Sequence, residues 1–296
     1  MSNEILAITI TFNPEIERLN MQIVQLGKDN VDILIVDNGS GNNAEISALL
    51  EKHSASVKLF LLDNNVGIAA AQNYGIRYAK EQGYKYVLLM DQDSVPSKNM
   101  VDNLLIALHD HDHAAAVGPI FVDNSGVTHS RFIRVEGLRV NKHLQPDTNG
   151  CVSVDHLIAS GSLIPVDVFD KIGLMDESLF IDYVDVEWSL RARNHGLCCY
   201  GVMNATMTHS LGDRRVSVFT RNVAIHSPLR HYYQVRNAVL LYKRNYIPTN
   251  WKIVDFYKLI AKLAVFIFSA ENKSLEMKMI SKGFLDGFRN VSGKYD

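Results

Sequence analysis

The sequence predicts an α/β fold with an open, mostly parallel sheet that carries helices on both faces. Two observations support this prediction. Short and almost continuously apolar segments recur through the first 120 residues, as in strands that are buried on both faces. Segments with helical periodicity lie between them. Such an alternation of strands and helices is typical of a parallel sheet with helical crossovers.

The individual elements of this first part follow from the same patterns. The expected strands are residues 5–12, 31–37, 57–63, 84–90 and 115–122. The expected helices are residues 14–28, 44–53, 67–82 and 97–109. Pro14 suits the first turn of the first helix, where a missing N–H costs nothing.

The chain beyond residue 122 is less regular. Residues 128–140 are compatible with a hairpin or a loop, and helical patterns return at 166–173 and 185–196, where Gly196 suits a C-cap. Residues 197–209 predict a late strand, and the chain is expected to be helical from residue 227 onward. We divide the chain into a first domain, residues 1–222, and a basic, mostly helical C-terminal region, residues 223–296.

Composition places the protein among ordered globular chains. Its 296 residues are 47% hydrophobic, which supports a sizeable core. The cysteines are Cys151, Cys198 and Cys199, an odd number without a CxxC pair, which favours reduced thiols in the cytoplasm. The N-terminal residues lack the basic start of a signal peptide and are expected to form the first strand. No apolar run is long enough to predict a spanning helix.

Charge is distributed unevenly along the chain. Residues 1–213 carry a net charge of −12 and residues 214–296 a net charge of +10. A basic C-terminal region predicts an anionic partner, either nucleic acid or a membrane. The acidic body would repel a duplex, so nucleic acid is the less favoured partner.

Residues 251–268 predict an amphipathic helix. Lys252, Asp255, Lys258 and Lys262 share one stripe of this helix, and most of the remaining residues are aromatic or aliphatic. This pattern predicts peripheral binding to the anionic inner face of the plasma membrane. The alternative is a helix that packs on the protein body or on a second subunit of a homo-oligomer.

Polar residues follow four consecutive predicted strands. Because ligands of open α/β sheets bind beyond the carboxyl ends of the strands, these residues are candidates for a binding site. Each could also be an ordinary turn or N-cap residue. They are Thr11 and Asn13 after the first strand, Asp37 after the second, Asn65 and Gly67 after the third, and Asp91, Gln92 and Asp93 after the fourth.

Among them, Asp91 and Asp93 give the most specific indication of a binding site. Two carboxylates so close repel each other, which raises one pKa or favours a bound cation. Oxygen ligands in a loop suit Mg²⁺ or Mn²⁺. The alternative is a solvated turn in which Asp93 caps the following helix.

The stretch NVGIAAAQNYG opens a helix with small residues. Gly67 and the alanines after it would allow a diphosphate to approach backbone N–H groups at the helix N-terminus, or they could serve plain helix packing. The sequence contains neither GxGxxG after the first strand nor a P-loop motif, which argues against a dinucleotide-binding fold and a P-loop NTPase.

A second acidic cluster lies in the stretch FIDYVDVEW. The cluster holds Asp182, Asp185 and Glu187. On a helix, Asp182 and Asp185 would share a face, and Trp188 follows Asp185 by three residues. A carboxylate beside an indole is a plausible general base with a stacking surface for a sugar ring. An acidic helix N-terminus is the structural alternative. His209, just past the late strand, could complete a metal site or be structural.

The ordered set TFNP, VDNGS, NVGIAAAQNYG, DQD, SGSLI, DYVDVEW and MTH resembles the family 2 glycosyltransferases with a GT-A fold, and among them the bacterial rhamnosyltransferases of O-antigen and capsule synthesis. The resemblance covers about residues 5–245. It implies an inverting, metal-dependent transfer of a sugar, L-rhamnose from dTDP-L-rhamnose, to a hydroxyl of a lipid-linked saccharide.

The resemblance also implies roles for single residues. Asp185 is implied to be the catalytic base. Asp91, Asp93 and His209 are implied to bind the metal ion. The implied nucleotide-binding residues are Thr11, Asn13, Asp37, Asn65, Gly67, Asn73 and Gln92. The implied acceptor-binding residues are Asp182, Glu187 and Trp188.

Two positions depart from the family pattern. Gln72 stands where many relatives have arginine, so one charge partner of the diphosphate is missing. Val184 precedes Asp185 where an acidic residue is usual, and Asp182 is a possible substitute.

Two other functions remain as alternatives. A sugar nucleotidyltransferase would also combine such a sheet with metal-binding carboxylates, but residues 11–20 lack its glycine-rich basic loop. A non-catalytic module that binds nucleotide sugars or saccharides would not need Asp185 near a metal site.

Overall fold

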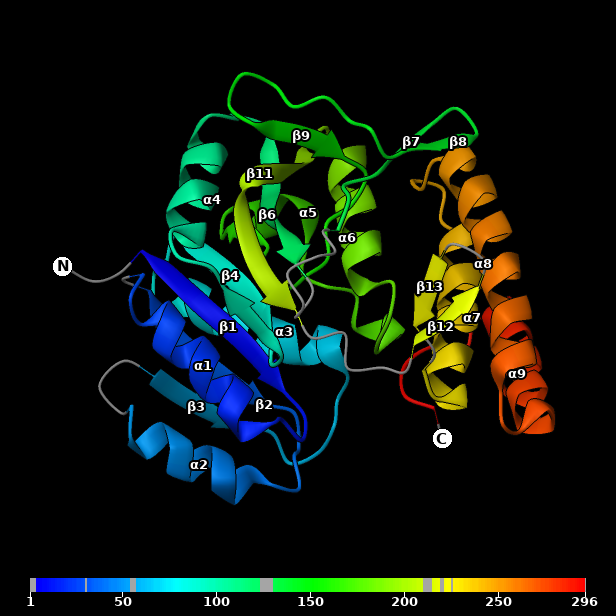
Figure 1. Cartoon of the computed structure of the whole chain (residues 1–296), viewed down its shortest axis with the longest axis horizontal. Coiled ribbons are helices and arrows are strands. Elements are labelled where there is room, and N and C mark those ends of the chain that lie inside the picture. The colour runs from blue at the N-terminus through cyan, green and yellow to red at the C-terminus, as the bar shows by residue number, and fades with distance from the viewer. Residues whose placement is uncertain are drawn as a thin grey trace.

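The computed structural model describes residues 4–29, 31–53, 57–122, 130–209, 215–218, 221–224 and 226–295. A mixed sheet forms its centre (Figure 1). Its strands are β1 (Ile5–Thr11), β2 (Asp32–Asp37), β3 (Val57–Leu61), β4 (Tyr86–Asp91), β5 (Ser94–Pro96), β6 (Ala114–Val122), β9 (Cys151–Val154), β10 (Leu163–Pro165) and β11 (Cys198–His209). The strand order is β3-β2-β1-β4-β10-β6-β11-β5, and β9 pairs with β11.

The predicted fold class is confirmed, and the described sheet adds three short antiparallel strands, β5, β9 and β10, that were not expected. Strands β3, β2, β1 and β4 are parallel, as are β6 and β11. The short strand β10 lies between β4 and β6 and runs antiparallel to both. Three residues carry too little periodicity to be predicted as a strand, so the sequence did not reveal this insertion. Residues 134–136 and 139–141 form a separate hairpin, β7–β8, which settles the hairpin-or-loop alternative for that part.

Helices cover both faces of the sheet (Figure 1). They are α1 (Ile16–Leu26), α2 (Asn43–Glu51), α3 (Ile68–Glu81), α4 (Met100–His109), α5 (Val168–Ile172), α6 (Val184–Asn194), α7 (Pro228–Tyr242), α8 (Thr249–Ser269) and α9 (Lys273–Phe288). One apolar core joins the sheet to α1, α2 and α4, and another joins it to α3, α5 and α6. Strand β1 shows the division, because Ile5 and Ala7 enter the first core and Leu6, Ile8 and Ile10 the second.

The three C-terminal helices pack on one another and on the body. Small residues let α9 approach α7 closely, since a Cβ atom at Gly283 would come within 2.8 Å of the Tyr232 carbonyl oxygen. Trp251 and Val254 of α8 join the same core as the residues of the sheet. The boundary between residues 1–222 and 223–296 stays a prediction, and the two regions share buried apolar surface.

The orientation of α8 corrects our sequence interpretation. Lys258 and Lys262 line a pocket on the inner side of the helix, and Asp255 accepts hydrogen bonds from the hydroxyls of Tyr183 (2.9 Å) and Tyr242 (2.7 Å). Apolar residues are also exposed on this helix, with Tyr257 69% and Phe268 79% exposed. Asp255 therefore faces the body of the protein, where its tyrosine partners lie, while Lys258 and Lys262 line the pocket and are still exposed to solvent.

Two further observations concern the cysteines and the length of the helices. The three cysteines are free thiols. Within the described part of the chain, no helix is both long and apolar enough to cross a membrane.

Candidate active site

The turn that carries Asp91 and Asp93 is held in place from two sides. Asp91 is the last residue of β4. The buried Gln22 of α1 donates hydrogen bonds from Nε2 to the carbonyl oxygens of Asp91 (2.7 Å) and Ser94 (2.5 Å). Ser160 Oγ accepts the Asp91 N–H at 3.0 Å. Both ends of the turn are thus fixed, which positions the two carboxylates beyond the end of the strand.

The charges that act on Asp91 and Asp185 show that the predicted metal ligand and the predicted base are neighbours. Burial, followed by the charge of Asp93, raises the pKa of Asp91 to about 7, and Arg230 opposes this shift. Burial raises the pKa of Asp185 to about 6, with the charges of Asp91 and Asp182 adding to the effect and the Val186 N–H opposing it. Carboxylates from two distant segments therefore share one poorly solvated site.

Arg230 is a site residue that our sequence analysis missed. It lies in the first turn of α7 and forms an ion pair with Asp182, with Nε to Oδ2 at 3.2 Å. Its positive charge also opposes the rise in the pKa of Asp91. Ser227 as N-cap and Pro228 in the first turn mark the start of α7. The sequence therefore contained the signal for a helix that begins just before Arg230. Arg230 brings a positive charge to a site that otherwise gathers aspartates.

The segment before Asp185 has an unusual backbone. Phe180, Asp182 and Tyr183 have φ values of 63°, 62° and 64°, which are uncommon for residues with a side chain. Helix α6 begins only at Val184, so the prediction that Asp182 and Asp185 share a helix face is wrong. They still lie close together, because the charge of Asp182 contributes to the raised pKa of Asp185.

Two buried residues of α7 hold this segment. Asn237 Nδ2 lies at hydrogen-bond distance from the carbonyl oxygens of Leu179 (2.9 Å), Ile181 (2.7 Å) and Asp182 (2.9 Å). Arg236 Nη2 donates to the Leu179 carbonyl at 2.9 Å. Such contacts can maintain backbone conformations that are otherwise unfavourable. The C-terminal region therefore helps to position the loop that leads to Asp185.

We predict that Asn237→Ala lowers both stability and kcat. Buried carbonyl groups lose their donor, which costs about 1–3 kcal/mol, and the loop before Asp185 loses its support. Thermal unfolding and steady-state kinetics would measure the two effects. The control is Leu263→Ala, a buried truncation in α8 that should lower stability without lowering kcat. An unchanged kcat in the folded Asn237 variant would contradict a positioning role.

The predicted nucleotide-binding residues of the first two strands form one buried network. Thr11 Oγ1 donates to Asp37 Oδ1 at 2.8 Å, and the Ser40 N–H donates to Asp37 Oδ2 at 2.9 Å. Asn13 donates its N–H to Ser40 Oγ and accepts the Gly41 N–H, both at 2.8 Å. The strand ends and the loop after β2 are thus tied together. Contact of these residues with a nucleotide stays a prediction.

The loops after β3 and β4 are also fixed by hydrogen bonds. Gln92 Oε1 accepts the Phe12 N–H at 2.7 Å, which joins the Asp91 turn to the end of β1. Asn65 Oδ1 accepts the Gly67 N–H at 3.0 Å and an Asn38 side-chain N–H at 3.2 Å.

Gly67 is needed for a protein contact, in contrast to our hypothesis of a diphosphate cradle. It has a φ of 90°, and a Cβ atom there would lie 2.6 Å from the ring of Phe180 and 2.7 Å from its carbonyl oxygen. The next N–H, that of Ile68, donates to the Phe180 carbonyl at 2.7 Å. The N–H groups of Gly67 and Ile68 are therefore both bonded within the protein, and contact of Gly67 with a nucleotide stays a prediction.

Three other predicted site residues serve the interior of the protein. Asn73 is buried and bonds the backbone of Met175 from both of its side-chain polar atoms. Trp188 is 2% exposed and donates to the Gly173 carbonyl at 3.0 Å. Glu187 is fully buried and is bonded by Arg191 and Arg244. These side chains are thus engaged within the protein, and nucleotide contact of Asn73 and acceptor contact of Glu187 and Trp188 stay predictions.

His209 can be placed only through its backbone. It is the last residue of β11 and pairs with Ser94 of β5, directly after Asp93 in the chain. The strand therefore delivers it beside the Asp91 turn. Its side chain lies outside the described part of the structure, so its role as a metal ligand stays a prediction.

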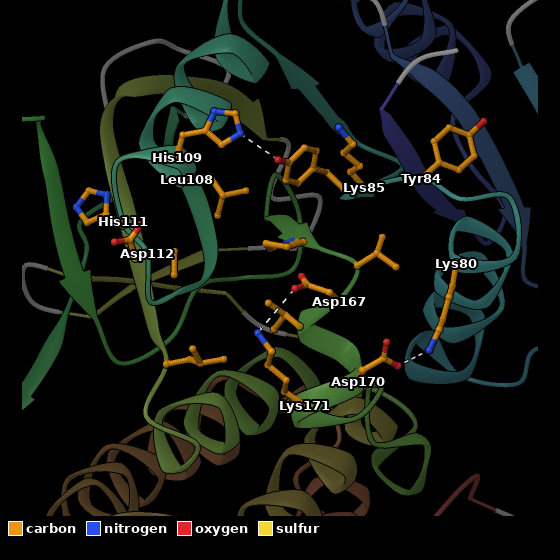
Figure 2. A pocket seen from close by; sticks show the side chains of 16 residues that line it. Lys80, Tyr84, Lys85, Leu108, His109, His111, Asp112, Asp167, Asp170 and Lys171 are labelled. Atoms are coloured by element: carbon orange, nitrogen blue, oxygen red, sulfur yellow. Dashed lines mark hydrogen bonds and ion pairs between the residues drawn. The ribbon is translucent and has the colours of Figure 1, made fainter. Parts of the chain in front are cut away.

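A large pocket lies at the opposite end of the sheet. It has a volume of about 610 Å³ and includes Tyr84 and Tyr86, where β4 begins rather than ends. Figure 2 shows charged side chains around it in pairs, such as Lys80 with Asp170 and Lys171 with Asp167. None of the acidic site residues lines it. This pocket is separate from the candidate active site.

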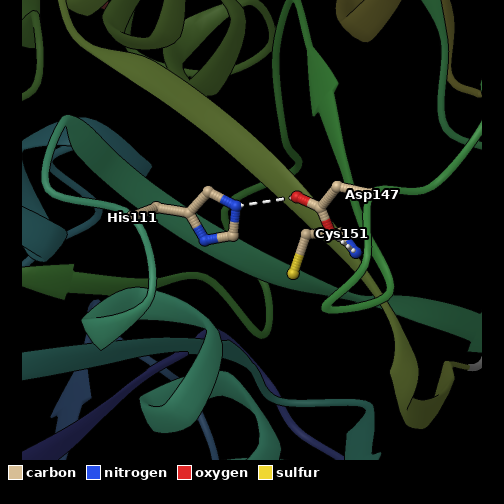
Figure 3. A group of neighbouring side chains, drawn as sticks. All are labelled: His111, Asp147 and Cys151. Atoms are coloured by element: carbon tan, nitrogen blue, oxygen red, sulfur yellow. Dashed lines mark hydrogen bonds and ion pairs between the residues drawn. The ribbon is translucent and has the colours of Figure 1, made fainter.

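His111, Asp147 and Cys151 form another cluster away from the site (Figure 3). His111 Nε2 lies 2.9 Å from Asp147 Oδ2, and Asp147 Oδ1 accepts the Cys151 N–H at 2.9 Å. Burial raises the pKa of the Cys151 thiol to about 11, so the sulfur stays protonated. An ion pair and a turn explain the cluster, which is not the metal site predicted at Asp91.

Comparisons with known proteins agree with this geometry. The family model "Glycosyl transferase family 2" matches residues 7–173. The dTDP-rhamnosyl transferase RfbF of Shigella flexneri is 36% identical over 296 residues, which cover 99% of this chain and 98% of that protein. The hexosyltransferase Agl10 of Haloferax volcanii is 24% identical over 56% of this chain and 54% of its own.

Solved structures support the fold. The structure of GalNAc-T7 with UDP, GalNAc and Mn²⁺ has a TM-score of 0.62 at 14% identity, covering 97% of this chain and 56% of that chain. That of Staphylococcus aureus TarS with UDP-GlcNAc has a TM-score of 0.62 at 16% identity, covering 97% and 81%. A sheet whose carboxyl edge gathers acidic residues, a family model over more than half of the chain and a relative along its whole length agree: this chain belongs to glycosyl transferase family 2.

Proposed function

We propose that this glycosyltransferase moves L-rhamnose from dTDP-L-rhamnose to a hydroxyl group of a saccharide, with inversion at the anomeric carbon. One observation carries the transfer chemistry. Asp185, with a pKa of about 6, shares a poorly solvated site with the Asp91 turn and Arg230. The choice of donor rests on the 36% identity to a dTDP-rhamnosyl transferase over nearly all of both chains.

Asp185 would act as the general base. A pKa of about 6 leaves the carboxylate ionised at neutral pH and makes it a stronger base than an exposed aspartate. It would take the proton of the acceptor hydroxyl during attack on the anomeric carbon. One base without an enzyme nucleophile supports direct displacement and therefore inversion. Arg230 would bring positive charge to the side where the departing diphosphate gains negative charge.

The Asp91 turn fits a divalent cation. Burial, and then repulsion by Asp93, raise the pKa of Asp91, and both aspartates offer hard oxygen ligands. Mg²⁺ or Mn²⁺ would therefore be held by Asp91 and Asp93, with His209 as a third ligand implied by its place at the end of β11. When bound, the ion would stabilise negative charge on the diphosphate.

A turnover assay tests the donor and the reaction together. The protein would be incubated with Mn²⁺, a lipid extract as the source of acceptors, and dTDP-L-rhamnose, UDP-glucose or GDP-mannose in turn. We expect release of dTDP that depends on the extract and is absent with Asp185→Asn. Release of UDP or GDP instead would contradict the donor. Formation of pyrophosphate from dTTP and a sugar 1-phosphate would favour a nucleotidyltransferase.

We also propose that the protein works at the cytoplasmic face of the plasma membrane on a lipid-linked acceptor. The support is the apolar outer side of α8, which we name the α8 stripe: Ile253, Phe256, Tyr257, Ile260 and Phe268, each at least 38% exposed. An exposed row of aromatic and aliphatic residues beside a basic region is typical of helices that lie on a membrane surface.

Replacing Tyr257 and Ile260 together with serine is predicted to release the protein from anionic vesicles. The substitution removes exposed apolar area without touching the core, so folding should be unaffected. Flotation with phosphatidylglycerol vesicles would measure binding, and a Leu138→Ser variant, exposed but on the β7–β8 turn, is the control. A wild type that does not float but sediments as a dimer, which the double variant breaks, would show that the stripe joins two subunits.

A further inference from the structure

A pocket opens next to the candidate active site. It has a volume of about 340 Å³ and is formed by α8 and by the loop that leads into α6. Asp182 and Val186, which flank Asp185 in the chain, line it together with Trp251, His156, Lys258 and Lys262. The pocket therefore lies between α8 and the segment of chain that carries the proposed base.

Positive charge gathers in and around this pocket. Lys258 and Lys262 line it, and Lys142 lies close enough for its charge to lower the pKa of Lys258. Burial and these two neighbouring lysines lower the pKa of Lys258, while Asp255 and Asp155 oppose the shift. Among the residues that the structure describes, none of the three lysines has a carboxylate within ion-pair distance. Ammonium groups that repel one another in this way favour the binding of an anionic ligand.

The acidic groups nearby are already engaged with other partners. Asp182 pairs with Arg230 at 3.2 Å, and Asp155 pairs with Arg193 at 2.7 Å. Asp255 accepts the hydroxyls of Tyr183 and Tyr242, and burial raises its pKa. These carboxylates therefore do not neutralise the lysines fully, and the pocket keeps an excess of positive charge.

A histidine adds an unused polar atom to the pocket wall. Nδ1 of His156 is buried and has no hydrogen-bond partner in the described part of the protein. Burial, with Lys258 and Lys262, lowers the pKa of His156 to about 4, so the ring is neutral. A neutral imidazole with a free nitrogen can donate one hydrogen bond to a bound ligand. This buried polar atom is therefore available to a ligand in the pocket that His156 lines.

We propose that this pocket binds the phosphate or diphosphate group that links the acceptor saccharide to its lipid. This inference rests on the proposed function. The acceptor hydroxyl would lie at Asp185, the anionic group between Lys258, Lys262 and His156, and the lipid along α8, whose outer side carries the α8 stripe. One helix would then recognise the anionic link on its inner side and meet the membrane on its outer side.

Binding can be tested without any transfer reaction. Trp251 lines the pocket, so its fluorescence should change on titration with decyl diphosphate in EDTA, which removes metal ions from the Asp91 turn. We expect the double variant Lys258→Gln and Lys262→Gln to raise the Kd at least about tenfold. The control is Lys273→Gln with Lys278→Gln on α9, which removes the same charge at exposed positions. Equal affinity in both double variants would overturn the proposal.

Kinetics would separate the possible sources of the phosphate group. With a glycosyl diphosphate acceptor, the Lys258 and Lys262 variant should raise the acceptor KM at least about tenfold and leave the donor KM unchanged. With the matching alkyl glycoside, which lacks phosphate, wild type and variant should be equal. A raised donor KM would assign the lysines to the nucleotide. Loss of vesicle binding with an unchanged acceptor KM would assign them to lipid head groups.

The two proposals can fail separately. If the wild type binds decyl diphosphate and the double variant does not, but no sugar is transferred from any nucleotide, the pocket stands and the proposed function falls. If rhamnose is transferred equally well to acceptors with and without phosphate, the function stands and the pocket proposal falls.

Discussion

Asp185→Asn is expected to lower kcat by roughly 10²–10⁴-fold, the usual contribution of a general base. The amide keeps the size and the hydrogen bond to the Val186 N–H but cannot accept the acceptor proton at neutral pH. Donor binding should change little, because Asp185 is not among the proposed nucleotide contacts. Initial rates with dTDP-L-rhamnose would measure kcat, and calorimetric titration with dTDP would measure donor-site affinity.

The matched control for this variant is Asp170→Asn, an exposed aspartate of α5 that pairs with Lys80. It should retain full activity. Robust transfer by the Asp185 variant would remove Asp185 from the role of base. Because the raised pKa of Asp185 is about 6, wild-type kcat should also fall as the pH drops below 6, where the carboxyl group is protonated. A kcat that stays constant from pH 7.5 to pH 5 would contradict this assignment.

Asp93→Ala is expected to abolish stabilisation by Mn²⁺. Without metal, the variant should be as stable as the wild type or more stable at pH 7.5, because the pKa of Asp91 is raised to about 7 by burial first and then by the charge of Asp93. A folded-state pKa above that of the unfolded chain makes ionisation of Asp91 unfavourable for folding as pH rises from about 4 to 7. Removing Asp93 relieves that repulsion.

Mn²⁺ at about one hundred times its Kd should stabilise the wild type by about 2.7 kcal/mol, which corresponds to several degrees in Tm. The Asp93 variant should show no such shift, while Glu81→Gln, an exposed acidic residue at the end of α3, should respond like the wild type. Equal Mn²⁺ shifts in all three proteins would show that the ion binds elsewhere.

Much of the fold could be predicted from the sequence, because buried parallel strands and their helices have strong periodicity. The five early strands and the helices between them were expected close to their observed bounds. The insertion of β10 between β4 and β6 was not, since three residues carry no readable period. The orientation of α8 was also missed. The sequence predicts exposed lysines on this helix, and only the packing shows that the exposed Lys258 and Lys262 also line a pocket.

The position of a site residue could be predicted from the sequence where the strand order alone determines it. Asp91 and Asp93 follow a buried strand, so their place at the edge of the sheet follows from the strand order. The proximity of Asp185 to Asp91 depends on the loop at residues 180–183, whose backbone is held by Asn237 from a distant helix. Gly67 shows the opposite case. The sequence indicates that something approaches this glycine closely, but the structure is needed to show that Phe180 does so.

The central claim is that the Asp91 turn serves a metal-bound dTDP-sugar beside Asp185. Calorimetric titration of the wild type with dTDP and with UDP, each with and without Mn²⁺, tests it most directly. We predict binding that requires Mn²⁺, favours dTDP over UDP and is lost in Asp93→Ala but kept in Asp185→Asn. Absence of nucleotide binding under every condition, or equal binding by the Asp93 variant, would contradict the claim.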